Sequence, residues 1–269
     1  MQVRGKVFVV TGAGNGMGRE VVFGLVARGA RVAAVDLNAE ALDETVRLAN
    51  APDGHISTHP LNVTDRKKVL ALPAAVIKAH GQVDGVLNVA GIIQKFVKIA
   101  ELDFEDIERV MNVNFWGVVN VSKAFLPHLL ERPESALLNV SSMGGFLPVP
   151  GQAAYGASKA AVKLFTEALY AENQGTSLAV TIVFPGGVGT NITANSGVDM
   201  TAMMQKAASG KPRKTTTPED AGRQIIEGLE KGSFRVLIGG DAKFMDRFAR
   251  LSPKRATLLI ADQMKSLLG

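Results

Sequence analysis

Residues 11–18 read TGAGNGMG and follow directly after the apolar run KVFVV at residues 6–10. The run predicts a buried strand, and a helical pattern begins at about residue 17. Glycines in such a turn reach positive φ and let main-chain N–H groups and the helix N-terminus approach a pyrophosphate. A glycine cluster alone is weak evidence, but between a strand and a helix it predicts a dinucleotide site at the head of a βαβ unit.

Apolar runs alternate with helical patterns along most of the chain. Because these runs are apolar throughout rather than at every second residue, they predict parallel strands buried on both faces. The expected fold is one α/β domain with a doubly wound, parallel seven-stranded sheet. Pro73 and Pro127 lie inside helical patterns and are expected to kink or interrupt them. Strands are expected at residues 6–11, 31–36, 55–61, 84–89, 135–141, 178–184 and 234–238, and helices near 17–29, 38–49, 65–80, 103–131, 152–173 and 218–231.

Two segments do not follow this alternation. Residues 187–216 are long and weakly periodic, which is typical of a lid over a site. The tail after residue 240 carries apolar residues at roughly helical spacing, and its apolar face needs a cover. We therefore expect a catalytic domain over residues 1–240, lid included, and a helical extension over 241–269 that packs on this domain or on a partner subunit. The tail residues are Phe244, Met245, Phe248, Leu251, Leu258, Leu259, Met264 and Leu267.

Composition excludes several classes of protein. The chain has no cysteine and four scattered histidines, so no metal site is expected. The net charge of +5 is spread among interleaved acidic and basic residues, which does not favour nucleic acid. No apolar run is long enough to span a membrane, and the expected location is cytoplasmic. The basic run at residues 211–214 is either a solvated loop or a docking point for a phosphate-bearing carrier.

Asp36 ends the second expected strand, 18 residues beyond Gly18. A carboxylate there can accept hydrogen bonds from the adenosine ribose hydroxyls and repel a 2′-phosphate. Neither Asn15 nor Leu37 offers a cation to hold such a phosphate. The sequence therefore predicts NAD rather than NADP, although Asp36 could instead cap the helix that follows.

Tyr155 and Lys159 lie four residues apart in YGASK, on one face of an expected helix. A free tyrosine has a pKa of about 10, and lowering it to about 7 requires ~4 kcal/mol of preference for the phenolate. A fixed ammonium one turn away can supply much of this preference. The pair is common by chance, so its meaning depends on the surrounding motifs.

Those motifs resemble the short-chain dehydrogenase/reductase family from about residue 6 to residue 240. TGAGNGMG matches the glycine turn TGxxxGxG, and NVAG at 88–91 matches the family's NNAG with Val89 replacing an asparagine. Asn114 precedes Gly117, Ser142 lies thirteen residues before Tyr155, and YGASK matches YxxxK. PGGVGT at 185–190 matches PGxVxT.

The resemblance implies a role for each matching residue. Tyr155 would be the general acid/base, Lys159 would lower its pKa and bind the nicotinamide ribose, Ser142 would donate to the substrate oxygen, and Asn114 would hold a water that connects Lys159 to solvent. Asn62 stands where the family usually has Asp beside the adenine. The implied cofactor residues are Gly12, Asn15, Gly16, Met17, Gly18, Asp36, Asn62, Val63, Asn88, Ala90, Gly91, Tyr155, Lys159, Pro185, Gly186, Val188 and Thr190.

Three segments are expected around the reacting carbon: 92–97, 143–152 and the lid. Their apolar and methionine-rich side chains suit a lipophilic alcohol or ketone, although many could simply pack the lid. The expected substrate residues are Ile93, Met143, Phe146, Val149, Gln152 and Gly187, with Ile92, Phe96, Leu147, Met200, Met203 and Met204 nearby.

The expected function is NAD-dependent hydride transfer between a secondary alcohol and its ketone (EC 1.1.1.-) by a homodimer or homotetramer. One alternative is reduction of 3-oxoacyl thioesters, with Lys211, Arg213 and Lys214 receiving the carrier's phosphates. The other is a protein that binds NAD without turnover, as a sensor or scaffold.

Overall fold

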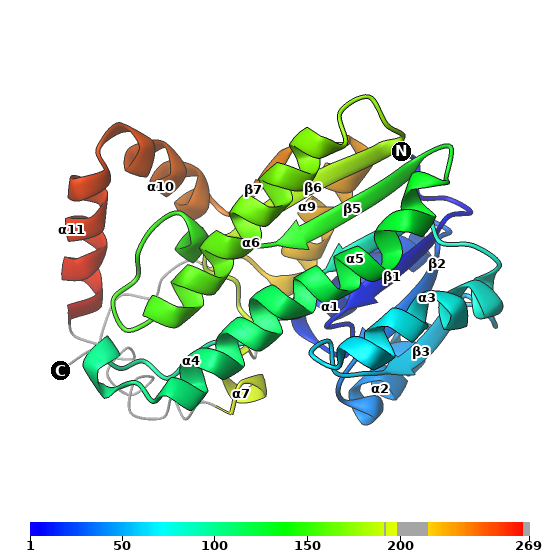
Figure 1. Ribbon diagram of the computed structural model, residues 1–269, viewed down its shortest axis with the longest axis horizontal. Helices are drawn as coiled ribbons and strands as arrows, with labels where there is room; N and C mark the ends of the chain where they lie inside the picture. Colours follow the sequence, from blue (N-terminus) through cyan, green and yellow to red (C-terminus); the bar gives the residue numbers. More distant parts are fainter. Residues whose placement is uncertain (191, 198–214, 266–269) are drawn as a thin grey trace.

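The computed structural model describes residues 1–190, 192–197 and 215–265. A parallel seven-stranded sheet forms its centre, with the strand order β3-β2-β1-β4-β5-β6-β7 (Figure 1). This is the doubly wound α/β fold expected from the alternating pattern. The strands are β1 (Val7–Thr11), β2 (Arg31–Asp36), β3 (Ile56–Pro60), β4 (Gly85–Asn88), β5 (Ser135–Val140), β6 (Leu178–Pro185) and β7 (Arg235–Ile238).

Helices cover both faces of the sheet. One core joins α1 (Gly16–Ala27), α2 (Ala39–Ala49) and α9 (Pro218–Glu230) to one face, and a second core joins α3 (Arg66–His80), α5 (Gly117–Leu130) and α6 (Ala153–Glu172) to the other. Alternate residues of β1 divide between the cores, because Phe8 and Val10 belong to the first while Val7 and Val9 belong to the second. The remaining elements are η1 (Ile99–Glu101), α4 (Phe104–Met111), η2 (Asn112–Trp116), η3 (Met143–Gly145), α7 (Ile192–Asn195), α10 (Gly240–Leu251) and α11 (Pro253–Met264).

The strand order reverses between β1 and β4. The chain moves outward from β1 to β2 and β3, then returns to pair β4 with the other side of β1. In such sheets ligands bind beyond the carboxyl ends of the strands at this reversal. The glycine turn at residues 11–18 lies there, directly after β1.

Neither Pro73 nor Pro127 interrupts its helix, so the expected interruption is wrong at both positions. Both α3 and α5 continue through their prolines. A proline inside a helix costs a hydrogen bond, and the buried neighbours compensate for it: Leu72 and Val76 in α3, and Phe125 in α5. The expected helix over 103–131 is instead broken by η2, a π-helical turn between α4 and α5.

The two C-terminal helices stand at one side of the molecule, at the left of Figure 1. Met245, Ile260 and Met264 are buried, as helical spacing of the tail predicted. The same prediction fails for Phe244, Leu251 and Leu258, which are 60%, 85% and 55% exposed. The apolar stripe is therefore wider than the face that this chain covers. Leu267 lies outside the described residues.

Candidate active site and nucleotide cleft

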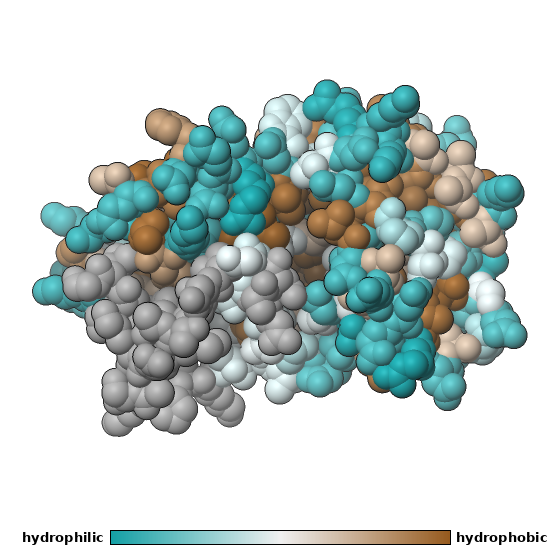
Figure 2. Space-filling view, turned by 90° about the horizontal axis from the view of Figure 1, so that it is seen from below, coloured by the Kyte–Doolittle hydropathy of each residue, from teal (hydrophilic) through white to brown (hydrophobic). Residues whose placement is uncertain are grey.

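A cleft of about 410 Å³ lies at the strand-order reversal. Figure 2 shows a hollow near the middle of one face, with hydrophobic residues inside it. Of the expected cofactor residues, the cleft brings together Gly12, Asn15, Gly16, Met17, Gly18, Asp36, Asn62, Val63, Ala90, Gly91 and Thr190. Its other lining residues are Val35, Leu37, Asn38, Leu61, Val89, Ile92, Val113 and Ile192.

The glycine turn is packed so tightly that side chains are excluded. Gly12 has φ of +71°, and a Cβ there would lie 2.9 Å from the main chain of Ala90. A Cβ on Gly18 would collide with the carbonyl of Gly12. The Thr11 hydroxyl accepts hydrogen bonds from the N–H groups of Val89 and Ala90 at 3.1 and 3.2 Å, which fixes the turn after β1 against the loop after β4.

Asp36 holds the same turn from the end of β2. Its carboxylate accepts the N–H of Gly14 at 2.9 Å and the N–H of Asn38 at 3.0 Å. The helix that follows is capped by Asn38, whose Oδ1 accepts the N–H of Ala41. Asp36 is therefore not the cap of α2, and its carboxylate lies in the wall of the cleft.

Asn62 and Val63 lie where an adenine would be expected. Asn62 Oδ1 already accepts the main-chain N–H and the hydroxyl of Thr64, at 3.0 and 2.9 Å. Val63 is buried, and a Cβ on Gly117 would approach its Cγ2 to 2.7 Å. A glycine at position 117 thus lets α5 pack closely behind Val63.

Asn88 points into the sheet rather than lining the cleft. Its Nδ2 donates to Asn139 Oδ1 at 2.8 Å and to Ser122 Oγ at 3.2 Å, and Asn139 in turn donates to Thr166. Asn88 is 2% exposed. In this structure it connects β4 to β5 and α5, so its contact with a cofactor would be indirect.

Ser142 and Tyr155 face one another. The Ser142 hydroxyl hydrogen-bonds the Tyr155 phenol and also accepts the N–H of Gly144 at 3.0 Å. Burial raises the pKa of Tyr155 above its ordinary value, and the hydrogen bond from Ser142 opposes that rise. The direction is opposite to the one that the Tyr155–Lys159 spacing predicted.

Burial explains this difference, and it acts on Lys159 as well. Its ammonium is buried, with 3% of the residue exposed, and donates to the carbonyl oxygen of Val140 at 2.9 Å. Burial lowers the pKa of Lys159 to about 8. A Cβ on Gly91 would lie 3.1 Å from Lys159 Nζ, so the ammonium borders the loop that lines the cleft.

Asn114 lies in the π-helical turn and is fully buried. Its side chain accepts the N–H of Ile92 at 2.8 Å and donates to the carbonyl of Ile92 at 2.9 Å and to Ser158 Oγ at 3.0 Å. All of these bonds join protein groups. The side chain thus fixes the loop after β4 against α6. If a water is held at this turn, as the family resemblance implies, other atoms of the turn would bind it.

The segment after β6 is anchored by the start of α10. Gly186 donates its N–H to Ile238, and Gly187 donates its N–H to the Asp241 carboxylate at 2.7 Å. Val188 pairs with Thr216 in a parallel bridge. Asp241 was not among the expected site residues, because its contact joins segments 54 residues apart.

Apolar side chains beside Ser142 merge with the C-terminal helices. Met143, Phe146 and Val149 from the expected substrate set pack in one cluster with Leu147, Phe96, Met245, Phe248, Ala249, Ala256, Leu259, Ile260 and Met264. We call this set the C-terminal cluster. Met200, Met203 and Met204 lie outside the described residues, as do Lys211, Arg213 and Lys214.

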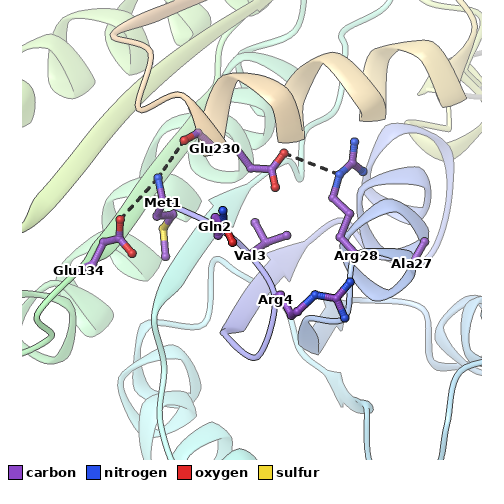
Figure 3. A pocket seen from close by; sticks show the side chains of 8 residues that line it. All are labelled: Met1, Gln2, Val3, Arg4, Ala27, Arg28, Glu134 and Glu230. Atoms are coloured by element: carbon purple, nitrogen blue, oxygen red, sulfur yellow. Dashed lines mark hydrogen bonds and ion pairs between the residues drawn. The ribbon is translucent and has the colours of Figure 1, made fainter.

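A second pocket, about 710 Å³, lies near the N-terminus (Figure 3). The N-terminal ammonium donates to the Glu230 carbonyl at 2.8 Å and lies 3.6 Å from the Glu134 carboxylate, and Arg28 lies 3.7 Å from the Glu230 carboxylate. None of the expected site residues lines it. The other cleft is therefore the candidate site. Within the described ranges there is no group of acidic residues and histidines that could hold a metal ion, and no helix long and apolar enough to cross a membrane.

Comparison with known proteins agrees with this architecture. The family model for short chain dehydrogenases matches residues 6–201. The chain is 40% identical over 261 residues to the putative oxidoreductase SadH of Mycobacterium tuberculosis, covering 96% of this chain and 94% of that protein. It is 35% identical over 193 residues to the 3-oxoacyl-[acyl-carrier-protein] reductase FabG of Thermotoga maritima, covering 72% and 78%.

A solved structure shows the same fold with a bound dinucleotide. It is a short-chain dehydrogenase/reductase from Burkholderia phymatum in complex with NAD, with a TM-score of 0.83 and 27% identity over 94% of this chain and 96% of that one. The fold and the matches define an oxidoreductase with a Rossmann-type sheet. The chain belongs to the short-chain dehydrogenase/reductase family.

Proposed function

We propose that this protein transfers hydride between NAD and a lipophilic secondary alcohol or ketone, with Tyr155 as the general acid/base. The observation that carries the proposal is the Ser142–Tyr155 hydrogen bond, with the buried ammonium of Lys159 one helical turn away beside the nucleotide cleft. A phenol in this position can accept the proton of an alcohol, and a serine hydroxyl can stabilise charge on the same oxygen.

The cleft fits a nicotinamide dinucleotide. The turn at Gly12–Gly18 would hold the pyrophosphate, Asp36 the adenosine ribose, Val63 the adenine and Thr190 the nicotinamide. Val188, which pairs with Thr216 and is not among the lining residues, would support Thr190. When bound, the oxidised cofactor supplies the hydride acceptor and a positive charge that adds to that of Lys159. NAD is favoured over NADP because the Asp36 carboxylate would repel a 2′-phosphate.

The protein's own groups then handle the proton. Burial raises the pKa of Tyr155 and so favours the protonated phenol. Tyr155 can therefore act as a base only if a nearby cation lowers its pKa. Lys159 supplies one where its ammonium stays charged, which the lowered pKa of about 8 restricts to solution below about pH 8.

The C-terminal cluster favours a lipophilic substrate. Met143, Phe146 and Val149 are partly buried hydrophobics that pack with α10 and α11. An apolar substrate that binds against this wall would gain free energy because its carbon atoms leave water, whereas a small carboxylate has little apolar surface to bury. The T. maritima relative is named as a 3-oxoacyl-[acyl-carrier-protein] reductase, which keeps 3-oxoacyl thioesters as the second candidate substrate.

The experiment is a turnover screen. A panel of secondary alcohols (2-octanol, cyclohexanol and 1-phenylethanol) with NAD at mildly alkaline pH, followed by absorbance of the reduced cofactor, should find at least one substrate. Acetoacetyl-CoA with reduced cofactor tests the thioester alternative. NAD binding without turnover in either arm would favour the sensor or scaffold alternative and contradict the proposal.

We also propose a homo-oligomer. Phe104, Trp116 and Leu164 on α4, η2 and α6 are 79%, 44% and 64% exposed, which is costly for large apolar side chains in water. Light scattering should return the mass of a dimer or tetramer, and Leu164→Glu should lower that mass. A monomer at micromolar concentration would contradict this proposal.

A further inference from the structure

Helix α6 begins without a side-chain cap of its own. Its N-cap residue is Gln152, whose side chain makes no capping hydrogen bond. The first N–H groups of a helix have no partner within the helix and need acceptors from elsewhere. Tyr155, the third residue of α6, donates its main-chain N–H to Oε1 of Gln94 at 3.0 Å, across 61 residues of sequence.

Gln94 is completely buried and uses its other polar groups on the same helix start. Its Nε2 donates to the carbonyl of Gly151 at 3.1 Å, and its main-chain carbonyl accepts Nε2 of Gln152 at 3.1 Å. A flipped Gln94 amide would place its NH₂ against the Tyr155 N–H and its oxygen against the Gly151 carbonyl. The network therefore allows one orientation only.

The carbonyl side of Tyr155 is held as well. Ser158 Oγ donates to the Tyr155 carbonyl at 2.7 Å and accepts Nδ2 of Asn114. Asn114 in turn holds both main-chain groups of Ile92. Both ends of the Tyr155 main chain are thus tied to residues 92–94, the segment that follows Gly91 and whose first residue, Ile92, lines the cleft.

We propose that Gln94 is a positioning residue: by accepting the main-chain N–H of Tyr155, it fixes the start of α6 so that the phenol stays in contact with Ser142. The inference rests on the proposed function, since it gives the position of the phenol a catalytic consequence. An error of about 1 Å in such a position costs on the order of 100-fold in rate. Because Gln94 is out of contact with water, no solvent molecule replaces the bond when it is removed.

The contact can be tested without a substrate. The chain has only two tyrosines, so protein labelled with ¹⁵N-tyrosine gives two amide signals, and Tyr170→Phe identifies the Tyr155 signal. Gln94→Met keeps the volume and removes both hydrogen-bonding groups. We expect the Tyr155 amide to exchange its proton at least about tenfold faster in this variant, since a lost bond of ~1.4 kcal/mol is a tenfold change.

The role is tested by turnover of the alcohol found in the screen. Gln94→Met should lower kcat by about 10- to 100-fold while the Kd for NAD stays within about twofold. If Gln94→Met does not fold, Gln94→Asn, whose side chain is one methylene too short to reach, provides the same comparison.

A matched control lies at the other end of α6. Asn173 is also buried and donates its amide to the carbonyl of Leu169 at 2.7 Å. Asn173→Leu should lower Tm without changing kcat or the exchange of the Tyr155 amide. Unchanged exchange or unchanged kcat in Gln94→Met, or an equal loss of kcat in Asn173→Leu, would overturn the inference. Activity in Tyr155→Phe would instead overturn the proposed function.

Discussion

Lys159 donates its ammonium to the carbonyl oxygen of Val140 at 2.9 Å, in a site where only 3% of the lysine is exposed. Burial lowers its pKa from 10.5 to about 8. The protein therefore carries an ammonium that its fold disfavours. A residue kept at a cost in stability points to function, and the predictions below follow from this site.

Replacing Lys159 should stabilise the protein and abolish turnover. In Lys159→Met the buried charge is gone, which removes a cost on the order of 3 kcal/mol, while the lost hydrogen bond to Val140 takes back about 1 kcal/mol. We expect the free energy of unfolding to rise by about 1–2 kcal/mol near neutral pH. Urea unfolding measures it.

The pH dependence of that gain has a defined sign. The pKa of Lys159 is lowered in the folded state, so the cost is fully present below about pH 8 and fades as pH rises toward 10.5. The stabilisation should shrink over the same range. Lys163→Met, on the same helix in an ion pair with Glu167, should give no gain, and an equal gain there would contradict the explanation.

Ser142→Ala should slow alcohol oxidation by about 100-fold. The Ser142 hydrogen bond lowers the pKa of Tyr155, so its loss should raise that pKa and move the ascending limb of kcat/KM to higher pH. Ser141→Ala is the control, because the Ser141 hydroxyl donates to the Lys159 carbonyl and not to the phenol. A limb that moves equally in both variants would argue against the assignment of Ser142.

Asp36→Asn should change the choice of cofactor. The amide keeps the shape of the carboxylate and an oxygen for the N–H of Gly14, while the charge that repels a 2′-phosphate is removed. We expect NAD binding to weaken and NADP binding to strengthen, for a change of about tenfold or more in the Kd ratio. Fluorescence titration with the reduced cofactors gives both values. An unchanged ratio would refute the preference for NAD.

Acid should destabilise the outer edge of the sheet. Burial lowers the pKa values of His59 and His80, whose Nε2 atoms both hydrogen-bond Ser57 Oγ at 2.8 Å. These rings are neutral when folded and take up protons when unfolded, so stability should fall as pH drops below 6.5. In the double variant His59→Gln/His80→Gln, the free energy of unfolding measured in urea should fall less steeply below pH 6.5. An unchanged fall would contradict this prediction.

The parallel sheet and the succession of strands and helices along the chain could be predicted because each element carries its own local signal. Apolar runs mark β1 and β2, and the glycine turn marks the nucleotide end of the sheet. The π-helical turn at 112–116 could not be predicted, because residues 103–131 keep a continuous helical pattern. The turn carries Asn114, whose bonds to Ile92 join segments 22 residues apart.

Contacts between distant segments account for the rest. Gln94 reaches Tyr155, and Asp241 reaches Gly187, across gaps that no local pattern reports. The pKa direction of Tyr155 was also beyond the sequence, since the spacing of Tyr155 and Lys159 shows that they share a helix face but not that both are buried. Phe244 was placed on the apolar face of the tail by its helical spacing. The spacing could not show that this chain leaves Phe244 exposed.

The assignment of Tyr155 is tested most directly by comparing the two tyrosines of the chain. Tyr155→Phe and Tyr170→Phe each remove one hydroxyl, and Tyr170 packs against Phe234 rather than Ser142. With NAD bound to both variants at unchanged Kd, Tyr155→Phe should lose about 10³-fold or more of kcat for alcohol oxidation, while Tyr170→Phe keeps it. Turnover by Tyr155→Phe at a rate close to that of Tyr170→Phe would contradict the proposed catalytic base.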